Sequence, residues 1–147
     1  AAEVSAIIAD RPQDEITALD TYGRELGLAF QLVDDALDYG GLAQALGKNT
    51  GDDFREGKIT LPVVIALRNG SESEKRFWSR VMSDGEQEEA DFANAMELLD
   101  RHDALKATLD MAAEKSRIAK RALERFPDNE WKTALIDLAD FVVRRAS

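Results

Sequence analysis

The chain has 147 residues, which is long enough for one domain with a hydrophobic core. Its 19 basic and 29 acidic residues give a net charge of −10, which argues against nucleic acids and anionic membrane surfaces as partners. The chain has no cysteine, so disulfides, thiolate metal sites and thiol catalysis are excluded, and no apolar run reaches the roughly 18 residues of a membrane span. We therefore expect a cytoplasmic protein without stable membrane insertion.

A pattern typical of a helix opens the chain, over residues 1–9. It has neither an initial methionine nor a capping residue ahead of its first apolar residues, and Asp10, Arg11 and Pro12 stop it. This is the pattern of the end of a longer helix. We therefore expect that part of the protein lies upstream, the alternative being that a leader has been cleaved.

The second predicted helix is the longest and runs from about Asp14 to Tyr39, where Gly40 and Gly41 end it. Apolar residues recur along it at steps of three and four, and we expect this face to pack in the core: Leu19, Gly23, Leu26, Phe30, Val33 and Leu37. A different face carries Gly27, Gln31, Asp34 and Asp38. One apolar and one polar face are typical of a helix that lines a cavity.

The remainder of the chain is predicted as helices separated by turn signals. Residues 41–60 are rich in Gly, Asp and Lys and are mostly loop, with a short turn at 42–46. Thr60 and Pro62 fit a helix start, and Ser71 to Glu74 form a capping box. The predicted helices cover about 61–69, 72–82, 86–100, 102–125 and 129–145. No strand pattern is present, so we expect residues 1–147 to form one all-α domain of the helical bundle type.

Several residues in these later segments are predicted to be structural. We expect the last two helices to bury Leu105, Leu109, Ala112, Ala119, Leu123, Trp131, Leu135, Leu138 and Val142. Trp78 is expected to be a packing anchor, like Trp131. Asp52, Asp53 and Arg55 are expected to cap and pair within the loop, and the acidic pair could also help to order this lysine-bearing loop.

Asp34, Asp35 and Asp38 are the most informative residues of the sequence. On a helix, Asp34 and Asp38 are about 40° apart around the axis and roughly 6 Å apart along it, with Asp35 beside them. Three like charges this close repel one another unless a positive group lies between them, and carboxylate oxygens bind hard divalent cations well. The alternative is a solvated acidic face, but apolar residues such as Val33 and Leu37 are interleaved along this part of the helix and favour a partly buried helix.

A second polar cluster follows in the sequence GKNTGDDFREGKITLP, which contains Lys48 and Lys58. Its glycines allow the backbone to approach an anion. Gln31 lies one helical turn before Asp34, so its amide could bind the same ligand. Carboxylates suited to a metal, followed by lysines suited to an anion, indicate a phosphate ligand bridged by a metal.

These motifs together carry a family resemblance. The sequence FQLVDDALDYGG, followed by GKNTGDDFREGKITLPVVIAL, resembles the second half of trans-prenyl diphosphate synthases, most strongly over residues 22–67. The later segments ADFANAMELLDRHDALKATLDMA and LADFVVRR are most similar to bacterial long-chain members of the octaprenyl type. The resemblance implies the C-terminal part of an isoprenoid-synthase-type fold. It also implies that isopentenyl diphosphate is joined to an allylic diphosphate by ionisation, condensation and elimination. The expected use of the long-chain product is in quinone side chains.

The same resemblance implies a role for each site residue. Asp34, Asp35 and Asp38 match an aspartate-rich motif that binds Mg²⁺ on the allylic diphosphate. Lys48 and Lys58 match lysines that contact this diphosphate, and Gln31 matches a glutamine that faces the same pocket. Asp34, Lys48 and Lys58 are therefore the expected catalytic residues, because Mg²⁺ and lysines stabilise charge on the leaving oxygen.

The sequence also departs from the family pattern. A first aspartate-rich motif with its paired arginines is absent, as are the basic residues that bind isopentenyl diphosphate. We therefore expect that this chain is inactive by itself and that it forms homodimers or otherwise self-associates. The alternatives are a non-catalytic subunit of a two-component synthase and a relative of the terpene cyclases. The retained aspartates argue against the first, and the lysine-bearing loop argues against the second.

Overall fold

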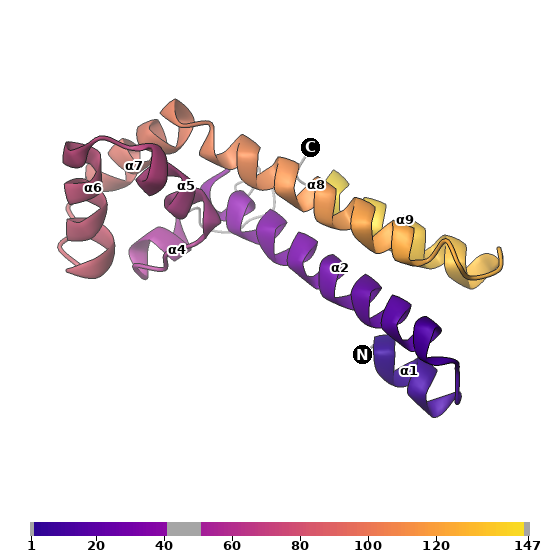
Figure 1. The fold of residues 1–147 in the computed structure, drawn as a ribbon. Coiled ribbons are helices and arrows are strands. Elements are labelled where there is room, and N and C mark those ends of the chain that lie inside the picture. Colours follow the sequence, from indigo (N-terminus) through magenta and orange to yellow (C-terminus); the bar gives the residue numbers. More distant parts are fainter. Residues whose placement is uncertain (1, 41–50, 146–147) are drawn as a thin grey trace. The chain divides into compact units, whose positions relative to one another are not determined.

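The computed structural model describes residues 2–40 and 51–145, and within these two ranges it contains helices and no strand (Figure 1). The elements are α1 (Ala2–Ile8), α2 (Gln13–Tyr39), α4 (Asp52–Arg55), α5 (Leu61–Asn69), α6 (Glu72–Trp78), the π-helix η1 (Ser79–Ser83), α7 (Asp91–Arg101), α8 (Ala104–Ala122) and α9 (Glu130–Arg144). The all-α prediction is confirmed. None of the helices in the described ranges is both long and apolar enough to cross a membrane.

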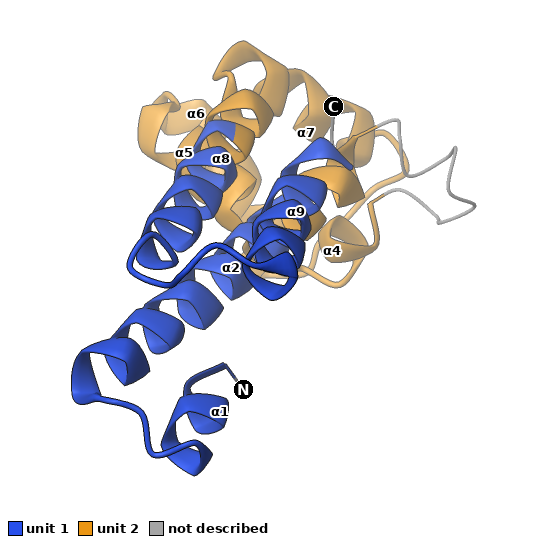
Figure 2. Cartoon of the chain, turned by 90° about the vertical axis from the view of Figure 1, so that its right-hand side faces the viewer, with its two compact units in different colours: residues 1–33, 110–147 blue, residues 34–109 orange. Residues whose placement is uncertain are grey.

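The chain divides into two compact units, coloured separately in Figure 2. Unit 1 contains residues 1–33 and 110–147, and unit 2 contains residues 34–109. The boundary of the first segment falls within α2, just before its aspartates, so these acidic residues belong to unit 2. The expectation of one domain over residues 1–147 stays a prediction.

Unit 1 is built from α1, most of α2, the second part of α8, and α9. Tyr22 is buried beside Leu123, and its hydroxyl donates a hydrogen bond to the carbonyl of Leu135 at 2.9 Å. The buried hydroxyl of Ser116 on α8 donates to the carbonyl of Ala139 on α9 at 2.8 Å. These contacts connect three helices through groups that would otherwise be buried without partners.

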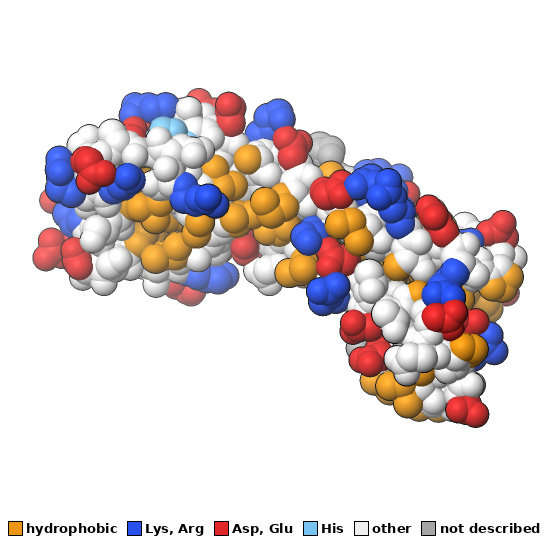
Figure 3. All heavy atoms as spheres, viewed as in Figure 1, with side chains coloured by type: hydrophobic (Ala, Val, Ile, Leu, Met, Phe, Trp, Pro, Cys, Tyr) orange, Lys and Arg blue, Asp and Glu red, His pale blue; other side chains and the backbone are white. Residues whose placement is uncertain are grey.

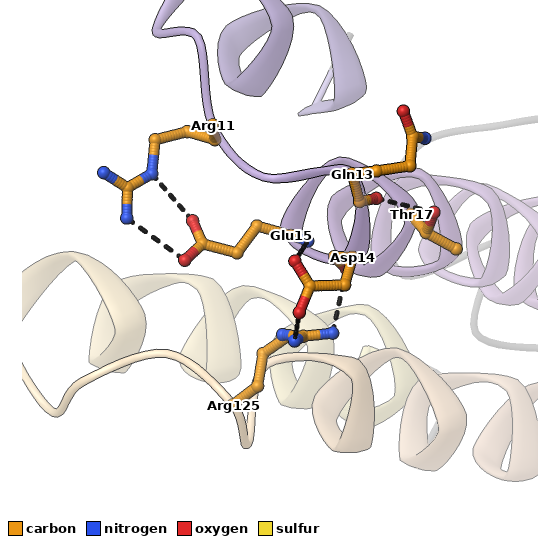
Figure 4. A network of polar contacts seen from close by, with 6 residues as sticks. All are labelled: Arg11, Gln13, Asp14, Glu15, Thr17 and Arg125. Carbon is orange, nitrogen blue, oxygen red and sulfur yellow. Dashed lines mark hydrogen bonds and ion pairs between the residues drawn. The ribbon is translucent and has the colours of Figure 1, made fainter.

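A second set of polar contacts lies at the start of α2 (Figure 4). The guanidinium of Arg125 donates a hydrogen bond to the carbonyl of Asp14 at 2.9 Å and also pairs with its carboxylate. Arg11, before the helix, pairs with Glu15 through two hydrogen bonds. Negative groups in the first turn interact favourably with the helix dipole, so both pairs support the beginning of α2.

Unit 2 packs α4 to α7 around a core that contains Trp78, Leu99 and Phe54. Arg80 binds both carboxylate oxygens of Asp91, at 2.7 and 2.9 Å. Gln87 donates hydrogen bonds to the carbonyls of Phe54 and Val81 at 2.8 and 2.9 Å. These bonds hold residues 84–90 as a loop, so the predicted start of a helix at residue 86 is wrong and α7 begins at Asp91.

The predicted core face of α2 is only partly confirmed, although Leu19 and Leu26 pack, partly buried, against the cluster of Tyr22, Ala119 and Leu123. Among its six predicted residues only Val33 is buried, and Phe30 is exposed. The face that is buried consists of Ala18, Tyr22, Glu25, Ala29, Val33 and Ala36. Apolar residues occur on more than one side of this helix, so steps of three and four fit two faces equally well. The small alanines allow close packing, and the carboxylate of Glu25 pairs with Lys115 at 2.9 Å.

Two predicted core residues of α9 lie at the surface. Trp131 is 73% exposed and Leu138 is 46% exposed, whereas Val142 is buried as predicted. Further apolar side chains, among them Val4 and Ile8, are exposed on α1, and Figure 3 shows hydrophobic side chains at the surface of the molecule. Part of the apolar surface of unit 1 therefore faces outward in this chain.

Candidate functional site

Three aspartates lie at the C-terminal end of α2, where the sequence predicts a metal site. The helix runs unbroken from Gln13 to Tyr39, so Asp34 and Asp38 lie about one turn apart on the same side. Asp35 is buried, with 7% of its surface exposed, and the other two are half-buried. Partly buried carboxylates respond more strongly to neighbouring charges than exposed ones do. This end of α2 is therefore not an ordinary solvated acidic face.

Asp38 links the end of α2 to the start of α4. Its carboxylate oxygens accept hydrogen bonds from the backbone N–H groups of Asp52 and Asp53, at 3.3 and 3.0 Å. Its carbonyl accepts a further bond from the N–H of Gly51 at 2.8 Å. A carboxylate placed at the free N–H groups of a helix start is favourable, so Asp38 caps α4. The sequence predicted Asp38 as a metal ligand and gave no indication of this second set of contacts.

Gly51 makes this close approach of the two segments sterically possible. Its φ is +80°, in the left-handed region that favours glycine. A Cβ at this position would lie 2.4 Å from a ring carbon of Phe92. The glycine predicted to let the backbone approach an anion therefore has a definite packing role in the structure.

Lys58 is held by Asp53 through both its backbone and its side chain. The ammonium nitrogen lies 2.9 Å from Oδ1 of Asp53, and the Lys58 N–H donates to the Asp53 carbonyl at 2.8 Å. The hydrogen bond to Asp53 raises the pKa of Lys58, and the charges of Asp35 and Asp34 raise it further. The amine therefore lies within the electrostatic field of the carboxylates at the end of α2.

Tyr39 and Thr60 form the buried side of this cluster. Tyr39 is almost completely buried, and burial is the main reason that its pKa is raised. The charges of Asp53, Asp38 and Asp35 add to this shift, while the hydroxyl of Thr60 opposes it. Sequence reasoning did not identify either residue as part of the site. The available signal was the position of Tyr39 directly after the last aspartate of the motif.

The chemistry of these carboxylate donors suits a hard divalent cation. Burial raises the pKa of Asp38 above its usual range, and the negative charges of Asp53 and Asp52 raise it further. The hydrogen bonds from the backbone N–H groups of these two residues lower the pKa and offset part of this shift. A positive ion nearby would remove this penalty, and carboxylate oxygens are the ligands that Mg²⁺ prefers. In the described part of the chain, no group of three or more acidic, histidine or cysteine side chains is already arranged to hold a metal ion. A cation here would need further oxygen ligands, from water or a bound anion.

The predicted roles of two further site residues are not tested by the described residues. Lys48 lies outside the residues that the structure describes. Gln31 is exposed on α2, in the segment assigned to unit 1. The structure thus brings Lys58 together with the aspartates and leaves the roles of Lys48 and Gln31 as predictions.

The sequence matches known proteins over almost its whole length. The polyprenyl synthetase family model matches residues 1–99. Octaprenyl diphosphate synthases from Haemophilus influenzae and Escherichia coli are 41% and 38% identical to this chain over 145 residues. These alignments cover 99% of this chain but only 44% and 45% of the relatives. The chain therefore spans less than half the length of the curated relatives it matches.

The fold is also similar to that of solved structures. A decaprenyl diphosphate synthase from Rhodobacter capsulatus is 47% identical, with a TM-score of 0.91 over 99% of this chain and 45% of that chain. A polyprenyl synthase from Caulobacter crescentus, described as complexed with calcium and isoprenyl diphosphate, is 52% identical. Its TM-score is 0.87 over 99% of this chain and 44% of that chain. Both sequence and fold relate this chain to one part of longer synthases.

Proposed function

Because this chain belongs to the polyprenyl synthetase family, we propose that it supplies the part of a prenyl diphosphate synthase that binds the allylic diphosphate. The observation that carries the proposal is the grouping of Asp34, Asp35 and Asp38 with Lys58 in unit 2. The complete reaction would join isopentenyl diphosphate to an allylic diphosphate by ionisation, condensation and elimination. The octaprenyl synthases among the relatives favour a long-chain product, with quinone side chains as the proposed use.

The three aspartates would hold Mg²⁺, which supplies positive charge to the diphosphate leaving group when it is bound. Asp34 and Asp35 offer carboxylate oxygens at the end of α2. Each oxygen of Asp38 accepts one backbone hydrogen bond and retains a further lone pair for a cation or its water ligands. Support comes from the Caulobacter crescentus relative, which is described with a divalent cation and isoprenyl diphosphate together.

Lys58 would bind the diphosphate directly. An ammonium group has three donors, and the contact with Asp53 uses one of them. The remaining donors can bond diphosphate oxygens and stabilise the negative charge that grows as the allylic C–O bond breaks. Lys48 and Gln31 are proposed as further contacts of the same ligand.

The chain spans about 45% of the length of its relatives, and we propose that other parts of the synthase fold complete the reaction site. We propose that this chain has no elongating activity by itself. We also propose that it self-associates, with the exposed apolar residues of α1 and α9 as the supporting observation, and that it acts in the cytoplasm.

The test is the binding of geranyl diphosphate, measured by isothermal titration calorimetry with Mg²⁺ or with EDTA. We expect binding that depends on Mg²⁺ and that weakens by about tenfold or more in Asp34→Ala. Asp20→Ala removes the same charge from an exposed position of the same helix and serves as the control. Equal binding in EDTA, or equal losses in the two variants, would refute the proposed site.

A further inference from the structure

We propose that Asp53 is a positioning residue that orients the Lys58 ammonium toward the diphosphate, and that Asp38 fixes Asp53 in its turn. This inference rests on the proposed function, because it concerns how that site holds its ligand. Asp53 lies outside the aspartate-rich motif of Asp34, Asp35 and Asp38.

Asp53 bonds Lys58 at two separate points. Its carboxylate lies 2.9 Å from the ammonium nitrogen, and its carbonyl accepts the Lys58 N–H at 2.8 Å. The Asp53 side chain is 15% exposed, whereas that of Lys58 is 50% exposed. The acceptor is therefore enclosed by the protein, while the amine it holds can still reach a ligand from solvent.

The backbone of Asp53 is fixed by the carboxylate of Asp38. The Asp53 N–H donates to Oδ2 of Asp38 at 3.0 Å, and the neighbouring N–H of Asp52 donates to Oδ1 at 3.3 Å. The position of Gly51, packed against the ring of Phe92, keeps this segment close to the end of α2. A continuous series of contacts thus runs from Asp38 through Asp53 to the amine.

Two opposing effects decide whether Asp53 helps or hinders anion binding. Its negative charge repels a diphosphate, which in water at about 7 Å corresponds to a factor of roughly two to three in affinity for each net negative charge that remains on the Mg²⁺-bound diphosphate. The contact with Asp53 also orders the flexible Lys58 side chain before the ligand binds. The entropy lost in ordering a free lysine corresponds to a factor of about ten or more in affinity. The ordering effect is larger, so the contact with Asp53 should favour binding.

Asp52 provides a matched comparison. It carries the same charge on the same short helix, but its carboxylate points to Arg55 and its side chain is 58% exposed. No hydrogen bond recorded among the described residues joins its carboxylate to Lys58. Removing the Asp52 carboxylate therefore changes the net charge near the site and leaves the orientation of the amine unchanged.

The experiment measures the dissociation constant of inorganic pyrophosphate in the presence of Mg²⁺ by isothermal titration calorimetry. We expect Asp53→Ala to weaken binding by about fivefold and Asp52→Ala to change it by about twofold or less. In a Lys58→Met background, Asp53→Ala should have no further effect, because the residue acts through the amine. A role of Asp53 in folding alone would give the same loss in both backgrounds.

Each result decides the inference. If the unaltered chain binds pyrophosphate and the two alanine variants behave alike, or if Asp53→Ala binds more tightly, the positioning role is refuted while the proposed function stands. If the unaltered chain shows no Mg²⁺-dependent binding, the proposed function fails and the inference falls with it. Circular dichroism checks folding, and Asp53→Asn and Asp52→Asn replace the alanine pair if Asp53→Ala does not fold.

Discussion

Glu74 and Ser71 bond each other across the first turn of α6. Oε2 of Glu74 accepts a hydrogen bond from the backbone N–H of Ser71 at 2.6 Å, and the Ser71 hydroxyl accepts one from the N–H of Glu74 at 3.4 Å. The same carboxylate pairs with Arg101 at 2.6 Å and lies 3.4 Å from His102. These contacts, with the backbone bond from Ser71 as the largest, lower the pKa of Glu74 from 4.5 to about 2.

We expect Glu74→Gln to lower the urea midpoint at pH 6 and to have a smaller effect as the pH falls. A carboxyl with a lower pKa in the folded state stabilises that state while it is ionised. Its contribution is therefore complete above 4.5 and is lost as the pH falls toward about 2. Glu72→Gln, at an exposed position that pairs with Lys75, should cause a smaller shift. Equal pH dependence of the two variants would contradict this.

Gly51→Ala should destabilise the chain by about 3 kcal/mol in urea denaturation, because it combines left-handed backbone strain with a clash against Phe92. Gly85→Ala is the control, since Gly85 has a φ of +70° but nothing within 4 Å of an added Cβ. That variant should show only the backbone cost, about 1 kcal/mol. Similar losses at both positions would show that the contact with Phe92 has no energetic effect.

The two tryptophans should differ sharply in their contribution to stability. Trp78 is 1% exposed in the core of unit 2, and Trp78→Ala should lower the free energy of unfolding by about 4 kcal/mol. Trp131 lies at the surface, and Trp131→Ala should cost about 0.5 kcal/mol or less. Urea denaturation of the two variants measures both values. A large loss for Trp131→Ala would indicate that this side chain is covered in solution, for example by self-association.

Incubating the chain with Mg²⁺, an allylic diphosphate and isopentenyl diphosphate should give no elongated product above the blank. The reason is that the family resemblance implies a first aspartate-rich motif and basic residues that bind isopentenyl diphosphate, and this sequence contains neither. Chromatography of the extracted prenyl products measures this directly. Robust elongation would show that the chain contains a complete reaction site.

The positions of most helices follow from local signals in the sequence. Gly40 and Gly70 mark helix ends, Ser71 and Glu74 form a capping box, and Asn129 caps α9 with its side chain. Such signals depend on neighbouring residues only, so they are visible without the fold. The start of α7 is different, because it depends on the bonds that Arg80 and Gln87 make across unit 2.

The same division applies to the candidate site, where the features set by local sequence were predictable and those set by the fold were not. The placement of Asp34, Asp35 and Asp38 at one end of the helix follows from helix geometry, and the cation that their spacing indicates stays a prediction. The capping of α4 by Asp38, and the hold of Asp53 on Lys58, depend on the backbone path of residues 51–58. Spacing along the chain contains no information about that path, so the partner of each carboxylate could not be predicted, although pairing and ordering by the acidic residues of this loop were expected.

The outward-facing apolar residues of α1 have a consequence for how the protein responds to ionic strength. Val4, Ile7 and Ile8 are each at least half exposed, on a molecule whose net charge is −10. Coulomb repulsion between such molecules acts over a Debye length of about 10 Å in 0.1 M salt, which shrinks to about 3 Å in 1 M salt. Concentrated salt removes the repulsion while leaving the hydrophobic attraction in place, so added electrolyte draws these molecules together.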